Sequence, residues 1–123
     1  MKLSIDYNSA KYSINGYKNG QISINNEPYT CNLVVTPEKL LVDWEPDSIE
    51  QITESHIHGL IELEPEIIIL GTGSKLTFPD TALMALAMQQ GIGFEVMDTG
   101  SACRTFNVLS AEDRNVIAAL MLI

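Results

Sequence analysis

The sequence predicts an α/β fold in a single domain, residues 1–123, with a β-rich first third followed by strand, helix, strand and helix. The main observation is the apolar run from Ile67 to Leu70, bounded by Pro65 and Gly71. Such a run is typical of a strand that is buried on both faces in a sheet covered by helices. Polar and apolar residues alternate before Trp44, whereas helix-start signals follow later. A chain of this length buries roughly two-thirds of its unfolded surface without disulfides or metal.

Antiparallel strands are expected in the first third, at residues 11–14, 21–24, 32–36 and 40–44. The first two lie around Asn15-Gly16 and Asn19-Gly20, and Asn-Gly is the strongest short hairpin signal. The second two lie on either side of Pro37-Glu38-Lys39, which we expect to form a turn. We therefore expect a hairpin or meander of half-buried strands.

Several helices are predicted after the first third. Ser48 with Gln51 matches a capping box, which places a helix start there, with Ile49, Ile52, Ile57 and Leu60 on its inner face. Pro79-Asp80-Thr81 opens a second helix, and Asp98-Thr99 caps a third. Short strands are expected at residues 75–78 and 94–97. Ser110 is expected to start or restart a final helix, with inner residues Val116, Ile117, Leu120 and Met121.

The order of elements after Ile67 predicts where a ligand would bind. Strand, helix, strand and helix imply parallel pairing with a right-handed crossover. In such sheets ligands collect at the carboxyl ends of the strands. The candidate binding residues at those ends are Gly71, Thr72, Gly73, Asp98, Thr99, Cys103 and Arg104.

Each of these residues also has a structural interpretation, which we favour. Gly71-Thr72-Gly73 lacks the third glycine of a dinucleotide site, because Leu76 stands there, so a turn with positive φ is favoured over phosphate binding. Asp98 would itself occupy the helix amides. A buried Cys103 is favoured over a reactive thiolate beside Arg104. Arg104 is expected to pair with Asp98 or Glu112. No catalytic residue and no cofactor is predicted.

Metal binding is not predicted either. His56 and His58 lie two residues apart, so on a helix they would point to different faces, and no Cys pair accompanies them. Asp43, Glu45 and Asp47 alternate, but they lack the spacing and the glycine of a calcium loop.

The net charge of −9, with only seven Lys and Arg, argues against nucleic acid and anionic membranes. Between Asp43 and Glu66 there are eight carboxylates and no Lys or Arg, which we interpret as a solvated face rather than a docking patch for a basic partner. Cys31 and Cys103 are expected to be thiols. No apolar run approaches a membrane span, and residues 1–7 lack the pattern of a signal peptide, so a cytoplasmic protein is expected.

Several motifs together resemble the domain of unknown function 498 family. The longest match is the run of thirteen residues from Met97 to Leu109 (MDTGSACRTFNVL). The other matching positions are Pro65-Glu66, Leu70-Gly71-Thr72-Gly73, Glu112, Arg114, Val35-Thr36-Pro37 and Trp44. Eukaryotic members of the family include a mitochondrial assembly factor for respiratory complex I and an adipogenesis-associated protein. The resemblance implies a three-layer domain with a mixed sheet and a role in assembly or scaffolding. It implies no established catalytic residue.

Two functional classes follow. The first, which we favour, is a non-enzymatic binding or assembly module that holds a protein partner, with respiratory complex subunits as candidates, through its crevice rim or the helix bearing Met84 and Met88. A homo-oligomer is left open. The second is an enzyme or small-molecule binder acting through Thr72, Thr99, Cys103 and Arg104. An open pocket with Cys103 exposed favours the second class, and a filled crevice favours the first.

Overall fold

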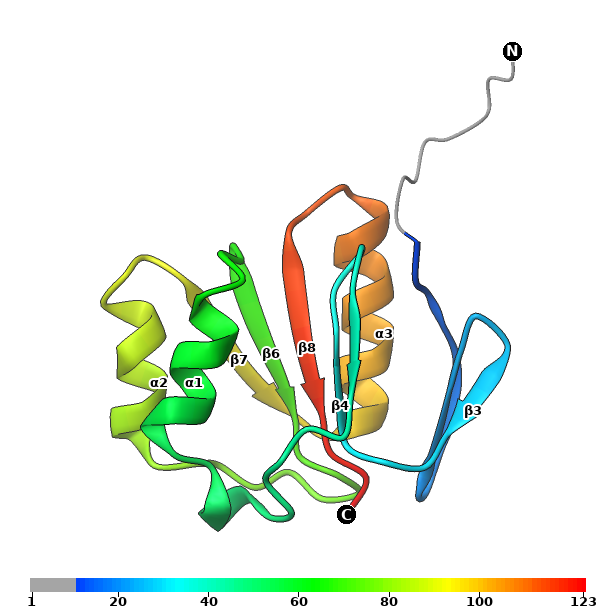
Figure 1. Ribbon diagram of the computed structural model, residues 1–123, viewed down its shortest axis with the longest axis horizontal. Coiled ribbons are helices and arrows are strands. Elements are labelled where there is room, and N and C mark those ends of the chain that lie inside the picture. The colour runs from blue at the N-terminus through cyan, green and yellow to red at the C-terminus, as the bar shows by residue number, and fades with distance from the viewer. Residues whose placement is uncertain (1–10) are drawn as a thin grey trace.

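The computed structural model describes residues 11–123, and the amino-terminal residues 1–7 discussed above lie outside this range. Figure 1 shows a sheet seen nearly edge-on, with α1 and α2 on one side and α3 on the other. The elements in chain order are β1 (Ile14–Lys18), β2 (Gln21–Ile24), β3 (Glu27–Tyr29), β4 (Leu33–Val35), β5 (Leu40–Val42), the 3-10 helix η1 (Ile49–Gln51), α1 (Glu54–Ile61), β6 (Ile67–Gly71), α2 (Thr81–Met88), β7 (Gly93–Met97), α3 (Thr99–Ala111) and β8 (Val116–Leu120).

The main sheet has five strands in the order β5-β4-β8-β6-β7. β6 pairs in parallel with both β7 and β8, whereas β4 pairs antiparallel with β5 and β8, so the sheet is mixed. Ile68, Ile69 and Leu70 of β6 are fully buried, as a strand covered on both faces requires. The predicted α/β fold, its mixed sheet and its parallel pairing are confirmed.

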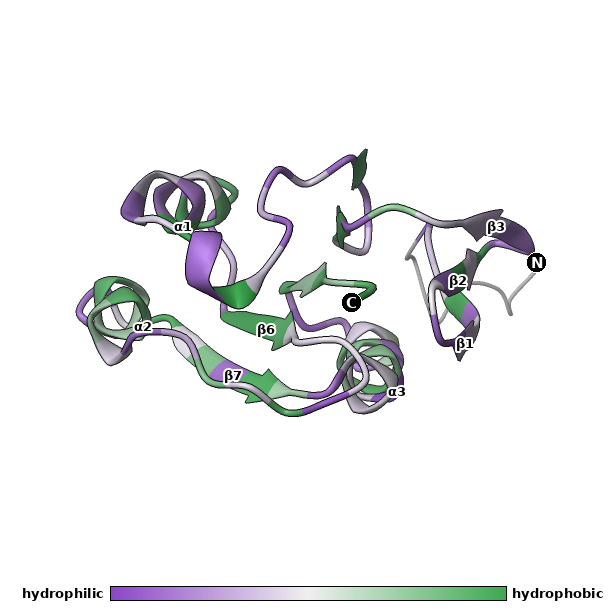
Figure 2. Cartoon of the chain, turned by 90° about the horizontal axis from the view of Figure 1, so that it is seen from below, coloured by the Kyte–Doolittle hydropathy of each residue, from purple (hydrophilic) through white to green (hydrophobic). Residues whose placement is uncertain are grey.

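Two hydrophobic clusters cover the two faces of this sheet. On one face α1 and α2 pack on a row of side chains from three strands, β4, β6 and β8: Val34, Ile68, Leu70, Ile117 and Ala119. On the other face Phe106 of α3 packs on the alternate residues of the same strands: Leu33, Ile69, Val116, Ala118 and Leu120. Figure 2, coloured by hydropathy, shows the green strands enclosed between these helices. The sheet therefore has no solvated face over its central strands.

The prediction of a final helix after Ser110 was wrong. α3 runs without interruption to Ala111, the chain turns at Asp113, which has a φ of 61°, and residues 116–120 form β8 in the middle of the main sheet. All five residues of β8 are buried. A run that is apolar at every position matches a buried helix and a buried strand equally well, so periodicity cannot separate them. The pairing of β8 with β4 and β6 decides the outcome.

The expected capping box at Ser48 was also wrong. Ser48 makes no side-chain cap, and only the short η1 follows it, because Ile52 returns to extended backbone. The helix begins after Thr53, where Nδ1 of His56 accepts a hydrogen bond from the Thr53 N–H at 2.9 Å.

Residues 75–78 do not form the expected strand. The Thr72 hydroxyl donates to the Lys75 carbonyl and accepts from the Thr77 N–H, so this segment folds back as a loop and leaves the Leu76 and Phe78 side chains exposed.

The amino-terminal hairpin forms at the second of the two expected Asn-Gly turns, its first strand lies at residues 14–18 rather than 11–14, and a third strand follows. Lys18 pairs with Gln21 across Asn19-Gly20, whereas Asn15-Gly16 lies within β1 at an irregularity. The additional strand β3 follows a turn in which Asn25 and Asn26 both have positive φ, the conformation of a type I′ hairpin. These three strands form a separate antiparallel sheet against α3.

Candidate functional site

The residues predicted at the strand ends do come together. The Thr72 N–H donates to the carbonyl of Met97 at 2.9 Å, and the Thr99 N–H donates to the carbonyl of Gly73 at 2.9 Å. The turn after β6 is therefore bonded directly to the segment between β7 and α3. Both lie at the edge where β6, β7 and β8 end, as parallel pairing requires.

This junction is filled by the chain itself. Thr99 is fully buried, and its hydroxyl accepts from the Gly73 N–H and donates to the Met121 carbonyl, each at 2.7 Å. Gly73 has a φ of +96°, and a Cβ at this position would overlap the carbonyl of Ile123. The Ser74 N–H donates to that same carbonyl at 3.0 Å. The last residues thus occupy the space that a ligand would take in an open crevice.

Asp98 caps α3 in the expected way. Its carboxylate accepts from the backbone N–H of Ser101 at 2.9 Å and from the Ser101 hydroxyl at 3.0 Å. These two bonds hold the pKa of Asp98 below its usual value. The amides at the start of α3 therefore already have an anionic partner.

Arg104 does not make the expected ion pair with Asp98 or Glu112. It donates instead to the Ser101 hydroxyl at 3.2 Å and remains exposed. Over residues 11–123, the ion pair between an arginine or lysine and a carboxylate is that of Arg114 with Glu66. The Ser101 hydroxyl lies between Asp98 and Arg104, because it donates a hydrogen bond to Asp98 and accepts one from Arg104.

Cys103 is a buried thiol. Only 4% of the residue is exposed, and burial raises its pKa to about 12, outweighing the opposite effect of Arg104. A thiol with this pKa is almost wholly protonated at neutral pH and is a poor nucleophile. Both Cys103 and Cys31 are free.

No group of three or more potential metal ligands occurs within residues 11–123. Nε2 of His56 lies 2.6 Å from Glu45, while His58 is exposed. Since Nδ1 of His56 accepts from the Thr53 backbone, its other nitrogen carries the hydrogen and donates to Glu45.

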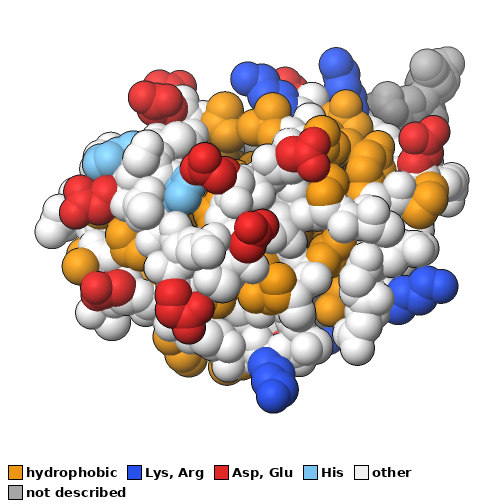
Figure 3. Space-filling model, turned by 60° about the horizontal axis from the view of Figure 1, so that its bottom comes forward, with side chains coloured by type: hydrophobic (Ala, Val, Ile, Leu, Met, Phe, Trp, Pro, Cys, Tyr) orange, Lys and Arg blue, Asp and Glu red, His pale blue; other side chains and the backbone are white. Residues whose placement is uncertain are grey.

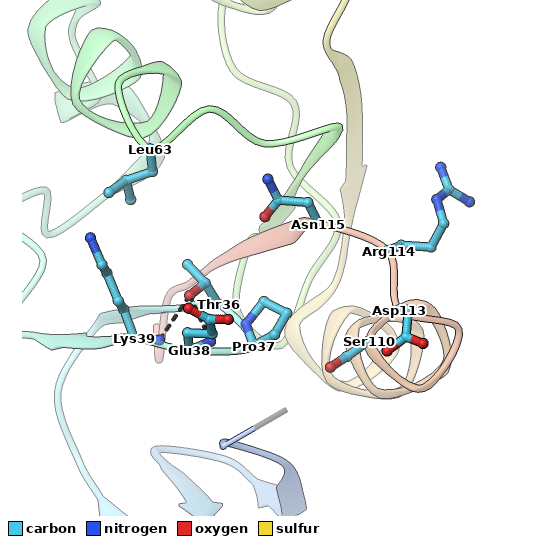
Figure 4. A pocket seen from close by; sticks show the side chains of 9 residues that line it. All are labelled: Thr36, Pro37, Glu38, Lys39, Leu63, Ser110, Asp113, Arg114 and Asn115. Atoms are coloured by element: carbon cyan, nitrogen blue, oxygen red, sulfur yellow. Dashed lines mark hydrogen bonds between the residues drawn. The ribbon is translucent and has the colours of Figure 1, made fainter. Parts of the chain in front are cut away.

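A polar groove of about 350 Å³ opens at the opposite edge of the sheet, between the β4–β5 turn and the α3–β8 turn (Figure 4). Its lining includes cations and anions in equal number: Lys39, Arg114, Glu38 and Asp113. The Ser110 hydroxyl is buried there without a hydrogen-bond partner among the described residues. Figure 4 shows the Arg114 side chain directed away from the groove. It pairs instead with Glu66 at 2.8 Å, and this hydrogen bond lowers the pKa of Glu66.

A second groove, which we call the β5–α1 groove, is more apolar. It has a volume of about 330 Å³ and is lined by Val34, Leu41, Val42, Asp43, Trp44, Glu45, Ser55, His56, Gly59, Leu60 and Leu63. Leu41 and Val42 are 46% and 47% exposed. The Trp44 and His56 rings meet edge to face, with centroids 6.0 Å apart. On the face where histidines are visible, Figure 3 shows acidic side chains scattered among apolar ones, with Lys and Arg at the periphery.

The β5–α1 groove is not among the candidate sites that the sequence predicts. The sequence shows the carboxylates between Asp43 and Glu66, but their pattern alone favours a solvated face. Their contribution to a groove rim depends on how β5 lies beside α1, which no local pattern encodes.

Comparison with known proteins agrees with the motifs. The model of the family described as "Protein of unknown function (DUF498/DUF598)" matches residues 14–121. The chain belongs to the DUF498 family. A solved NMR structure of a protein from Xanthomonas campestris superposes with a TM-score of 0.85 at 30% identity, covering 99% of this chain and 92% of that one. A structure titled an outer membrane protein from Bartonella henselae has a TM-score of 0.76 at 30% identity, covering 92% and 96%.

Curated relatives of this DUF498 chain carry different names. The rat protein named NADH dehydrogenase [ubiquinone] 1 alpha subcomplex assembly factor 3 is 36% identical over 94% of this chain, and the matched region covers 57% of the rat protein. A Francisella tularensis protein named 13 kDa major membrane protein is 31% identical over 81% of this chain and 82% of its own length. Within residues 11–123 of this chain, no helix has the length and apolar character needed to cross a membrane.

Proposed function

We propose that this DUF498 chain is a non-enzymatic module that binds a protein partner during the assembly of a larger complex. The observation that carries the proposal is the β5–α1 groove, which combines exposed apolar side chains with an acidic rim. Exposed apolar surface rimmed by polar residues is typical of protein interaction sites.

The names of the relatives support an assembly role. The rat and human proteins named assembly factor 3 are each 36% identical to this chain, so subunits of a respiratory complex are the first partners to test. The chain spans 57% of the rat protein and 58% of the human one. We propose a cytoplasmic location for this chain.

The alternative of an enzyme or small-molecule site at the strand ends gains no support. The Thr72 and Thr99 hydroxyls are engaged within the fold, and Cys103 is buried and protonated. Arg104 is exposed, but its guanidinium donates to the Ser101 hydroxyl within the same helix.

Affinity purification with matched variants tests the proposal. Leu41→Arg introduces a cation into the β5–α1 groove, and Val108→Arg makes the same change at an exposed position of α3. We expect tagged wild type and Val108→Arg to recover the same complex subunits from source cells, and Leu41→Arg to lose them while its thermal unfolding stays cooperative. Equal recovery by all three chains would refute a partner site in this groove.

A further inference from the structure

We infer that the β5–α1 groove accepts a basic, extended segment of the partner, which pairs with β5 as an additional strand. This inference rests on the proposed function and specifies how the partner is bound. Three features carry it: the backbone of β5, the apolar floor of the groove and the charge of its rim.

The outer edge of β5 has free backbone groups. The Thr36 N–H donates to the Lys39 carbonyl, so these residues form a hydrogen-bonded pair of the β4–β5 ladder. Antiparallel pairs alternate in type, so Leu41 also bonds to β4, whereas Leu40 and Val42 direct their N–H and C=O groups away from it. Within the described chain, β5 has no second neighbouring strand, and no other hydrogen bond uses the backbone of Leu40 or Val42. This edge can therefore accept a further strand.

The apolar floor gives an added strand side-chain contacts. β5 has only three residues, so main-chain hydrogen bonds alone would hold a partner weakly. Leu41, Val42 and Trp44 lie along this edge and are partly exposed. Leu41 lies opposite Val34 on the sheet face that α1 covers, so an extended segment could bury the alternate side chains of that face against Leu41 and Trp44.

The charge of the rim selects the occupant. Asp43 and Glu45 are exposed at the groove, and the stretch from Asp43 to Glu66 contains eight carboxylates without Lys or Arg. A segment with Lys or Arg among its apolar residues complements this field. A second copy of this chain, pairing through its own β5, would bring like charges together on a protein with a net charge of −9.

Trp44 allows a direct measurement, because it is the only tryptophan in the chain. The probe is a synthetic peptide of roughly eight residues, the length of an ordinary strand, that alternates lysine with valine. We expect it to change Trp44 fluorescence saturably, with an affinity that falls steeply as salt is raised from about 0.01 to 1 M. A peptide of the same length that alternates glutamate with valine should not bind.

Two substitutions at one position test strand pairing. Val42→Pro removes an outward N–H but no bond to β4, and Val42→Thr keeps that N–H. We expect Val42→Pro to weaken peptide binding about tenfold relative to Val42→Thr. If Val42→Pro fails to fold, the lysine–valine peptide N-methylated at alternate amides tests the same bonds on the wild-type protein, and we expect it to bind equally weakly.

Several results would overturn the inference. They are equal binding by Val42→Pro and Val42→Thr, binding of the methylated peptide at full strength, or binding of the acidic peptide. A concentration-dependent dimer that Val42→Pro abolishes would show that a second copy occupies the edge instead.

The two proposals remain distinguishable: if Leu41→Arg loses the cellular partner but the Val42 variants bind peptide alike, the proposed function stands and strand pairing is wrong. If Leu41→Arg keeps the partner, the proposed function itself fails.

Discussion

Thr99 illustrates how a residue at a typical ligand position can serve the fold instead. It follows β7 at the start of α3, where backbone amides often bind anions in α/β proteins. Its hydroxyl instead joins the turn after β6 to the segment after β8. The chemistry of a threonine is the same in both roles, so its residue type alone does not reveal which one it has.

At the same scale, we predict that Cys103 reacts slowly with thiol reagents. In the native protein at pH 7, its alkylation should be far slower than that of the partly exposed Cys31, because Cys103 is buried and its pKa is raised to about 12. Mass spectrometry of peptides after timed labelling measures both rates. In denaturant the two cysteines should react alike. Fast labelling of Cys103 in the native protein would contradict the burial described above.

Asp98 makes a pH-dependent contribution to stability. Its pKa is lower in the native state, so the folded chain binds fewer protons than the unfolded chain at acidic pH. The contribution is therefore present above the unfolded pKa of about 3.9 and is lost as the pH falls through the lower native value. Compared with Asp98→Asn, the wild type should lose more of its free energy of unfolding between about pH 5 and pH 2. Urea unfolding at each pH measures the difference, and parallel curves for the two chains would contradict the assignment.

At the scale of elements, the two central strands look alike in sequence but were not equally predictable. Residues 67–70 are bounded by Pro65 and by Gly71, and these boundaries favour a short strand. Residues 116–120 have no such boundary before the end of the sequence. Their apolar side chains fit the inner face of a helix as well as a fully buried strand.

We predict that Ile68→Ala in β6 lowers the free energy of unfolding by about 2 to 5 kcal/mol. The side chain is fully buried in the cluster beneath α1 and α2, so truncation leaves a cavity. Val108→Ala on the exposed face of α3 is the control and should change stability by less than about 0.5 kcal/mol. Urea denaturation measures both. A loss below about 1 kcal/mol for Ile68→Ala would be incompatible with the buried position of β6.

At the scale of the whole molecule, α3 connects the two sheets. One side of α3 packs on β6 and β8, and β1 of the smaller sheet also contacts the helix. Asn107 makes a specific link, since its amide accepts from the Ile14 N–H at 3.0 Å and donates to the Ile14 carbonyl at 2.7 Å. One side chain thus supplies both hydrogen bonds that Ile14 would otherwise make with a neighbouring strand.

We predict that Asn107→Ala loosens the smaller sheet selectively. The loss should be about 1 to 3 kcal/mol, because a partly buried N–H and C=O lose their partners. Amide hydrogen exchange should accelerate in β1 and β2 more than in β8. The exposed neighbour Val108→Ala serves again as the control. Equal acceleration in β1 and β8 would mean that the two sheets unfold as one unit and that the link is not local.

The sequence by itself determined the α/β fold, the buried strand β6, the start of α3 at Asp98 and the family. These depend on short-range signals: an apolar run with boundaries, a capping carboxylate and a long contiguous motif. It also placed the strand-end residues together correctly, because parallel strands connected through helices must end at the same edge.

Only the tertiary structure decided three further points: that residues 116–120 are a strand, that the carboxyl-end crevice is filled by residues 121–123, and that an acidic, apolar groove opens between β5 and α1. Each depends on contacts between segments far apart in the chain. A strand forms only where another strand is available to pair with it, and a groove forms only where the surrounding side chains leave space. A local sequence pattern contains neither the pairing partner nor the shape of that space.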